Sequence, residues 1–337
     1  MKVDPTSSPL SVSDVHSPAV RESARITRVG AASRRFDREA RVCGDACCLI
    51  CDATNCELAF PRRLSWLWRC RDCGLRFAWP QPTDCELAEV YGDDYFATFG
   101  FDAAGAEAYR SMKRVQAADL LEFAPAPVDG ATLLDVGAGL GDLVWVARQH
   151  GWDAMGIEMN PFAVATANNL MPECVIESTW EAFEPATRER FDVVTCTDVI
   201  EHVRDPEAAL GKLLACLRPG GCLLLTTPDV SCRRARWMGA AWYHYHRDHL
   251  WYFQRSTLVS VARRTGFEVE MCRPASKQFQ LAYVLSVLSS YPNQGSVRWI
   301  SRAIGRCLPA DWKGRLNLCV TEGLLLVARR PMGDYHP

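Results

Sequence analysis

Long apolar runs are missing from this chain of 337 residues. None reaches the roughly 20 residues that a helix needs to cross a bilayer, so no transmembrane segment is expected. The N-terminus also lacks the apolar core of a secretory signal peptide. Because the formal net charge is only −2, the chain has no broad basic field of the kind that nucleic-acid-binding proteins carry. A globular, cytoplasmic protein is the first expectation.

Cysteine, in contrast, is abundant: the chain has 16, and eight of them lie within residues 43–85. Cys48 and Cys51 form one CxxC pair, and Cys70 and Cys73 form a second pair after 18 intervening residues. Without a secretory signal, clustered CxxC pairs favour metal binding over disulfides. This spacing is typical of a four-thiolate zinc site, and a site with four thiolates has no open position for a substrate. The predicted role of the zinc is therefore structural.

The details of this zinc ribbon leave one choice open. Gly74 supplies the turn that the second CxxC pair needs, and the partly alternating aromatic residues of 60–68 are typical of hairpin strands. Cys47 could replace Cys48 as a ligand, and Cys56 is a nearby spare thiol.

Residues 131–160 predict a strand, a glycine loop, a helix and a second strand. The loop glycines are Gly137, Gly139 and Gly141. Glycine there permits a positive φ and lets a ligand approach the backbone closely. Glu158 follows the second strand, 21 residues after Gly137, where a carboxylate can accept hydrogen bonds from ribose hydroxyls.

Two cofactors compete for this unit, a dinucleotide and S-adenosylmethionine (SAM), and a turn without any ligand is a third reading. The G-x-G-x-G spacing differs from the G-x-G-x-x-G of dinucleotide sites. Asp135 would repel a pyrophosphate but could attract the cationic end of the methionine part of SAM. The unit therefore favours SAM, and a dehydrogenase is the least favoured function.

Further polar residues follow later strands of the predicted sheet. Thr179 and Trp180 come after a third strand, where an adenine ring would lie, and Asp198 comes after a fourth. Ligands of open α/β sheets bind at this edge. After a fifth strand, residues 242–253 contain three of the seven histidines beside an acid. Such a group suits proton transfer or substrate binding, with metal binding and plain packing as alternatives.

Two more motifs complete the pattern: Asp-Val-Ile-Glu-His-Val-Arg-Asp-Pro over residues 198–206 and Leu-Arg-Pro-Gly-Gly over 217–221. Together with the glycine loop and the acid, they resemble the class I SAM-dependent methyltransferases over about residues 126–275 and the final strand. The resemblance implies an α/β, Rossmann-like fold with a doubly wound sheet of seven strands, the last antiparallel. It also implies a cofactor site made by Asp135, Gly137, Gly139, Gly141, Glu158, Thr179, Trp180 and Asp198.

The front end, with its CxxC pairs and Trp-Pro-Gln-Pro at residues 79–82, is similar to a subgroup of these enzymes that carries a zinc ribbon. That subgroup includes sugar and natural-product methyltransferases, which have a Glu-His pair where this chain has Asp248 and His249. It implies methyl transfer to oxygen or carbon of a small-molecule acceptor. We expect His249, oriented by Asp248 and helped by His246 or Tyr243, to be the general base.

Two other functions stay open at this point. One is RNA methylation, with the zinc ribbon binding the nucleic acid, although the near-neutral charge disfavours it. The other is a protein that binds SAM and zinc without catalysis.

The predicted organisation is a disordered tail (1–41), the zinc ribbon (42–80), a helical connector (81–125) and the methyltransferase domain (126–330), with a helical lid at 276–320. A homodimer is compatible with the apolar helices of the lid.

Local signals add details that the structure can test. Thr83 and Ser256 are expected to cap helices. Strands are predicted at 267–272 and 324–328, and an apolar helix is predicted from Phe279 onward.

Overall fold

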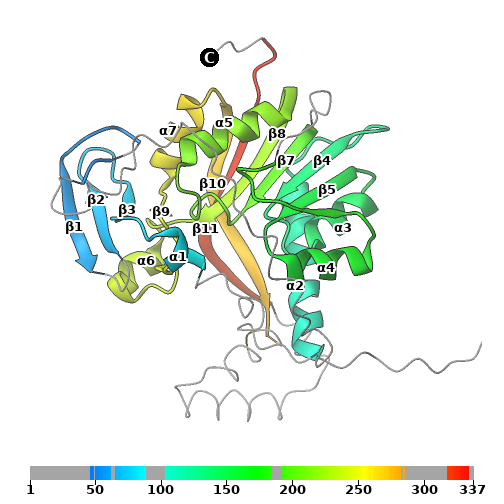
Figure 1. The fold of residues 1–337 in the computed structure, drawn as a ribbon, viewed down its shortest axis with the longest axis horizontal. Helices are drawn as coiled ribbons and strands as arrows, with labels where there is room; N and C mark the ends of the chain where they lie inside the picture. The colour runs from blue at the N-terminus through cyan, green and yellow to red at the C-terminus, as the bar shows by residue number, and fades with distance from the viewer. Residues whose placement is uncertain are drawn as a thin grey trace, which may run out of the picture. The chain divides into compact units, whose positions relative to one another are not determined.

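The computed structural model describes residues 46–48, 50–61, 65–88, 103–183, 191–281, 284 and 317–333 (Figure 1). The predicted tail and most of the predicted lid lie outside the described residues. Within the described ranges, no helix is both long enough and apolar enough to cross a membrane.

Seven strands form the main sheet. They are β4 (Thr132–Val136), β5 (Asp153–Glu158), β6 (Val175–Glu177), β7 (Phe191–Thr197), β8 (Leu217–Pro228), β10 (Glu268–Gln280) and β11 (Asn317–Arg329). Their order is β10-β11-β8-β7-β4-β5-β6 (Figure 1). Strands β4 to β8 pair in parallel, whereas β11 runs antiparallel to both β8 and β10. The predicted fold class is confirmed.

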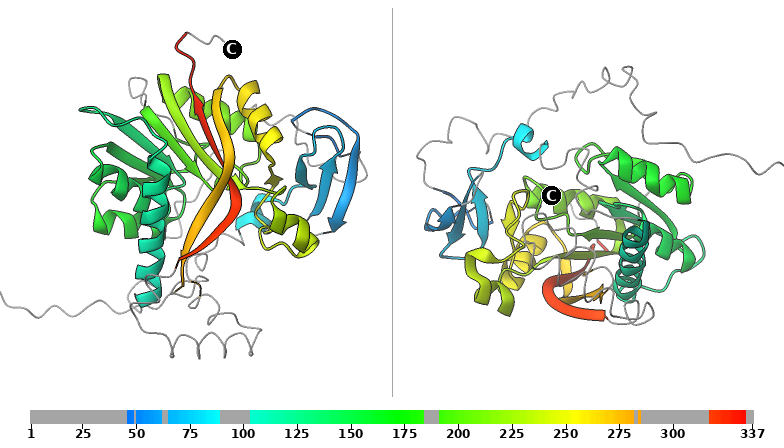
Figure 2. Two further views of the ribbon diagram at one scale, coloured as in Figure 1. Left: turned by 180° about the vertical axis from the view of Figure 1, so that it is seen from behind. Right: turned by 90° about the horizontal axis from the view of Figure 1, so that it is seen from below.

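Helices cover both faces of this sheet (Figure 2). They are α2 (Ala103–Leu121), α3 (Asp142–Gln149) and α4 (Pro161–Leu170) on one face, and α5 (Pro206–Cys216) and α7 (Arg255–Arg264) on the other. Neighbouring residues of a strand point to opposite faces. Leu133 accordingly packs with the core under α2 and α3, and Leu134 packs with the core under α5 and α7.

The strand order of the main sheet reverses at β4. The chain runs outward from β4 through β5 to β6 and then returns to place β7 on the other side of β4. In doubly wound sheets, ligands bind outside the carboxyl ends of the strands at this reversal. The glycine loop follows β4 and Asp198 follows β7, so both lie at the expected place.

A smaller sheet contains the cysteine-rich region. Its strands are β1 (Cys56–Pro61), β2 (Trp66–Cys70), β3 (Arg76–Trp79) and β9 (Trp251–Tyr252). The first three form the hairpin strands that the sequence predicts. The fourth was not predicted: β9 follows the histidine-rich segment and pairs antiparallel with β3, with Phe77 opposite Trp251. The cysteine-rich region and the histidine segment are thereby joined through one sheet.

Three local predictions can now be judged. Thr83 caps α1 (Asp84–Ala88): its hydroxyl oxygen accepts from the Glu86 N–H at 3.2 Å, which confirms the prediction. The cap at Ser256 is wrong, because α7 begins at Arg255 with Gln254 as its N-cap.

The helix predicted to start at Phe279 is also wrong at its start, because Phe279 and Gln280 pair with Leu318 and Asn317 in the β10–β11 hairpin. Both strands of this hairpin are longer than predicted, and residues 276–280 and 317–320 of the expected lid belong to it. Pairing across the hairpin overrides the local helical pattern.

Candidate functional site

The glycine loop after β4 is shaped by three positive φ angles: 75° at Gly137, 52° at Gly139 and 75° at Gly141. A Cβ at Gly137 would lie 2.4 Å from Val199, and one at Gly141 would lie 2.9 Å from Ala167. A Cβ at Gly139 would meet nothing within 4 Å. Gly137 and Gly141 are therefore needed for close packing against neighbouring side chains. Gly139 instead leaves the loop backbone open to a ligand.

Helix α2 holds this loop in place. Arg110 Nη2 donates to the Leu140 carbonyl at 3.1 Å, and Arg110 Nε and Arg114 Nε lie 3.0 and 3.1 Å from Asp142 Oδ1. Asp142 is buried at the start of α3, so its charge is compensated by two guanidinium groups. No local sequence pattern predicts these contacts, because the two elements lie about thirty residues apart.

Glu158 ends β5 and meets the glycine loop directly. Its Oε2 accepts from the Gly139 N–H and its Oε1 from the Asn160 N–H, both at 2.9 Å. Thr179 and Trp180 follow β6, and the Ser178 N–H donates to the Glu158 carbonyl at 3.0 Å. The predicted ribose acid and the start of the predicted adenine segment are therefore adjacent.

Asp135 lies in β4 and is 2% exposed. Thr195 Oγ1 donates to its Oδ1 at 2.7 Å. Burial raises the pKa of Asp135 to about 7, although the Thr195 hydrogen bond acts in the opposite direction. A cation bound nearby would favour the ionised carboxylate.

Asp198 follows β7 with a φ of 55° and forms an ion pair with Lys277 of β10. Burial acts to raise the pKa of Asp198, but the positive charges of Lys277 and Lys113 outweigh it and lower the pKa. Lys277 was missed because the sixth strand was expected to end five residues before it. Its ammonium group lies at the predicted boundary between cofactor and acceptor.

Four imidazole rings gather next to Asp198 and form what we call the histidine cluster: His202, His244, His246 and His249. The centroid of the His249 ring lies 4.6 Å from that of His202, 5.1 Å from that of His246 and 6.3 Å from that of His244. Burial lowers the pKa of His244 to about 4, so this ring is neutral at physiological pH.

The acid that was predicted to orient His249 contacts His202. Asp248 Oδ2 lies 3.3 Å from His202 Nδ1, and the Asp248 carbonyl lies 3.2 Å from the same nitrogen. Burial opposes the charged form of His202, yet the contact with Asp248 leaves its pKa raised. The pKa of Asp248 is lowered by the same contact against the effect of burial. His202 thus takes the place beside an acid that we expected His249 to have.

A buried carboxylate of β11, Glu322, holds the loop that carries the cluster. Its Oε2 accepts from Trp242 Nε1 at 3.1 Å and from the Tyr243 hydroxyl, and Arg234 Nε lies 2.7 Å from its Oε1. Burial and the Glu322 bond both raise the pKa of Tyr243. In this structure the Tyr243 hydroxyl therefore anchors the loop.

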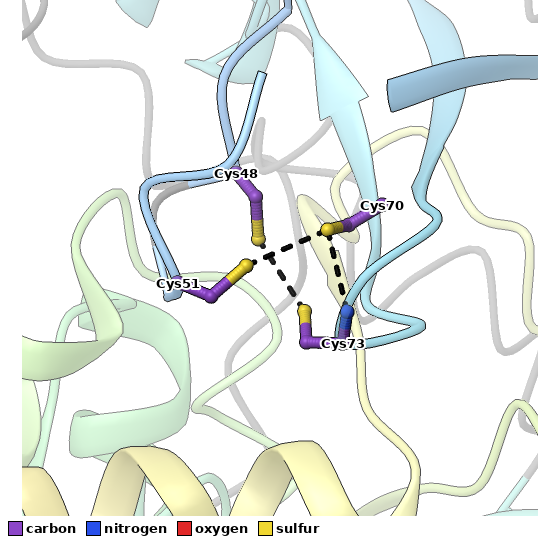
Figure 3. Close-up of side chains that lie close together, drawn as sticks. All are labelled: Cys48, Cys51, Cys70 and Cys73. Carbon is purple, nitrogen blue, oxygen red and sulfur yellow. Dashed lines mark hydrogen bonds between the residues drawn. The ribbon is translucent and has the colours of Figure 1, made fainter. Parts of the chain in front are cut away.

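The four predicted cysteine ligands come together at one point (Figure 3). Sγ of Cys48 lies 3.5 Å from Sγ of Cys73, and the same distance separates Cys51 from Cys70. All four sulfurs lie within 4.8 Å of one another. The Cys73 N–H points at the Cys70 sulfur from 3.5 Å, as in a turn that supports a thiolate.

The nearby thiols of Cys47 and Cys56 are not part of this group of four. Cys47 Sγ lies 3.5 Å from the Asp52 carbonyl, and Cys56 Sγ lies 3.7 Å from the Ala53 carbonyl. The structure therefore brings Cys48, and not Cys47, into the group of four. Four converging thiols suit a structural zinc ion.

Residues 107–271 match a protein family described as a methyltransferase domain. Together with the fold described above, the match shows that these residues form a methyltransferase domain, and it confirms the resemblance to methyltransferases inferred from the sequence. The matched range runs from α2 into β10 and includes the glycine loop and the histidine cluster.

Among individual proteins, the ubiquinone biosynthesis O-methyltransferase of Pseudomonas fluorescens is 38% identical over 103 residues, which are 29% of this chain and 44% of that relative. The protein of the same name from Coxiella burnetii is 31% identical over 102 residues, with the same two shares. The crystal structure of the [4+2]-cyclase SpnF aligns with a TM-score of 0.50 at 19% identity, over 75% of this chain and 99% of that one. The matches span less than half of the length of these two curated relatives. The likeness to the cyclase structure shows only that the two chains share a fold.

Proposed function

We propose that this protein transfers a methyl group from SAM to an oxygen or carbon atom of a small-molecule acceptor, such as a sugar or natural-product intermediate. The observation that carries the proposal is the position of two sites at one sheet edge. The glycine loop with Glu158 lies at the end of β4, and the histidine cluster lies beside Asp198 at the end of β7. The two similar O-methyltransferases are named for ubiquinone biosynthesis, which supports a small-molecule acceptor.

The cofactor site follows from the loop contacts. Gly139 offers an open backbone, and Glu158 already places both carboxylate oxygens beside the loop. We propose that Glu158 accepts hydrogen bonds from the ribose hydroxyls and that Asp135 attracts the cationic methionine end. Thr179 and Trp180 would then lie along the adenine, and Asp198 at the sulfur end.

Bound SAM would supply a methyl carbon on a positively charged sulfur, an electrophile that needs no activation. The protein's own residues must then align the acceptor and remove its proton. The loop held by Glu322 carries two candidates for the general base, His246 and His249. Because Asp248 contacts His202, this acid does not single out His249 as the base.

We further propose that Cys48, Cys51, Cys70 and Cys73 hold one structural zinc ion. The support is the convergence of four sulfurs and the absence of an open ligand position in such a site.

Titration calorimetry with S-adenosylhomocysteine tests the cofactor site. Wild-type protein should bind it, and Glu158→Gln should bind it about tenfold to a hundredfold more weakly, since hydrogen bonds to a charged group contribute roughly 1.5–3 kcal/mol. Glu268→Gln is the matched control, because Glu268 is an exposed residue at the start of β10. Failure of the wild type to bind would refute the proposal.

Turnover needs its own assay, because the methyltransferase fold also occurs in a cyclase. Release of S-adenosylhomocysteine should be measured with a panel of hydroxylated aromatic and sugar acceptors. Binding of SAM without release for any acceptor would favour the non-catalytic alternative.

A further inference from the structure

A second group of metal-ligand side chains contains two members of the histidine cluster and one buried acid. Glu201, His202 and His249 each offer one ligand atom, and these atoms lie within 4.8 Å of one another. The group is assembled from two segments that backbone hydrogen bonds hold together: the N–H groups of Leu250 and Trp251 donate to the Glu201 carbonyl at 2.7 and 3.2 Å. The arrangement is therefore fixed by the fold and does not depend on long, exposed side chains.

The carboxylate of Glu201 is the first argument for a ligand at this place. The residue is 1% exposed, and its Oε2 accepts from Thr227 Oγ1 at 2.9 Å. Its Oε1 is buried and has no hydrogen-bond partner within the described part of the chain. A buried carboxylate oxygen without a partner is costly, and a bound cation would remove that cost.

The contact between Asp248 and His202 is the second argument. When Nδ1 of a neutral imidazole donates to a carboxylate, Nε2 carries the lone pair. Carboxylate groups orient metal-binding histidines in this way and increase their basicity. Asp248 thus prepares His202 as a ligand.

We propose that Glu201, His202 and His249 bind one divalent transition-metal ion, distinct from the zinc of the cysteine site, and that this ion binds the acceptor hydroxyl. Two histidines and one carboxylate leave coordination positions open, unlike four thiolates. The inference rests on the proposed methyl transfer and makes its acceptor more specific: an ionisable hydroxyl whose oxygen can bind a metal.

The ion would change how the acceptor loses its proton. A bound divalent cation lowers the pKa of an oxygen ligand. The O–H bond of the acceptor breaks, the proton passes to His246, and the electron pair stays on oxygen. That oxygen forms a bond to the methyl carbon while the carbon–sulfur bond breaks, and its electron pair stays on sulfur. His249 is then a ligand, and His246, an exposed residue, is the base.

Binding of Mn²⁺ to the full chain tests the inference without any acceptor. Mn²⁺ prefers oxygen and nitrogen ligands over thiolates, so it reports on this site and not on the cysteines. Loss of the free Mn²⁺ signal in electron paramagnetic resonance should show one site per chain. Glu201→Gln and His249→Ala should weaken binding by at least tenfold, and Asp248→Asn should weaken it about tenfold to a hundredfold by releasing His202.

Controls separate this inference from the proposed function. Glu268→Gln should bind Mn²⁺ as the wild type does, and all variants should still bind S-adenosylhomocysteine, which shows that they are folded. No Mn²⁺ binding by the wild type, or unchanged binding by both Glu201→Gln and His249→Ala, would overturn the metal site while leaving methyl transfer intact. If Mn²⁺ binds but S-adenosylhomocysteine does not, the metal site stands and the proposed function fails.

Discussion

The cysteine site and the histidine cluster both gather metal-ligand side chains, but they are assembled in different ways. The cysteines come from two short turns separated by 18 residues, and each turn forms locally. The groups around the histidine cluster come from the end of β7, from the loop before β9 and from β11. A site made of local turns leaves a spacing pattern in the sequence, whereas a site made of distant segments does not.

The largest expected effect concerns the cysteine site. Cys70→Ser should lose zinc and unfold the small sheet, because zinc binding contributes roughly 10–16 kcal/mol to the folding of zinc-finger peptides. Zinc content and limited proteolysis within residues 46–80 measure both losses. Cys47→Ser is the matched control and should keep about one zinc per chain. One zinc retained by Cys70→Ser would contradict the four-thiolate assignment.

A substitution in the histidine cluster should lower turnover without unfolding the protein. His246→Asn should lower turnover by about 10²–10⁴, the usual cost of losing a general base. Binding of Mn²⁺ and S-adenosylhomocysteine should stay at wild-type levels, since this residue contacts neither in the proposed arrangement. Near-normal turnover would remove His246 from the role of base.

Glu322→Ala tests whether one buried carboxylate holds the loop. The change leaves the buried Trp242 Nε1 and the exposed Tyr243 hydroxyl without their acceptor, and an unsatisfied buried group such as Trp242 Nε1 costs about 1–3 kcal/mol. Urea unfolding should show this loss, and turnover should fall with it. Glu270→Ala, which removes an exposed ion pair with Arg329, is the control and should cost under about 1 kcal/mol. Equal midpoints for the two variants would argue against an anchoring role.

Asp135→Asn should change how the stability of the protein depends on pH. Burial raises the pKa of Asp135 from 3.8 to about 7, so the folded state holds a proton that the unfolded chain releases. This group therefore makes stability fall as pH rises between those two values, with no further loss above them. Asparagine cannot ionise, so the variant should not show this loss of stability. The free energy of unfolding of the variant minus that of wild type should therefore be larger at pH 8 than at pH 5. Parallel stability curves would contradict the raised pKa.

The sequence predicted well wherever a signal was local. The strand, glycine loop, helix and second strand of residues 131–160 form within one segment, and the structure has all of them in the predicted order. The cysteine turns and the cap at Thr83 are also features that form within one short segment.

Prediction failed where distant segments decide the outcome. Lys277 and Glu322 lie on β10 and β11, whose length depends on pairing between strands that the sequence places far apart. The contact between Asp248 and His202 could not be predicted either. His202 lies 46 residues earlier in the chain and reaches Asp248 only after β7 and β9 are in place. Spacing alone favoured the adjacent His249.

The pairing of β3 with β9 has a consequence for how the protein folds. Phe77 and Trp251 are opposite each other although 174 positions separate them, and Arg76 Nη1 donates to the Tyr245 hydroxyl at 2.7 Å. Contacts between such distant positions must close a long loop, so they form late. During synthesis the cysteine-rich hairpins must wait until five of the seven strands of the main sheet have been made before their last strand arrives. The histidine-bearing loop is thus expected to be among the last parts of the molecule to become ordered.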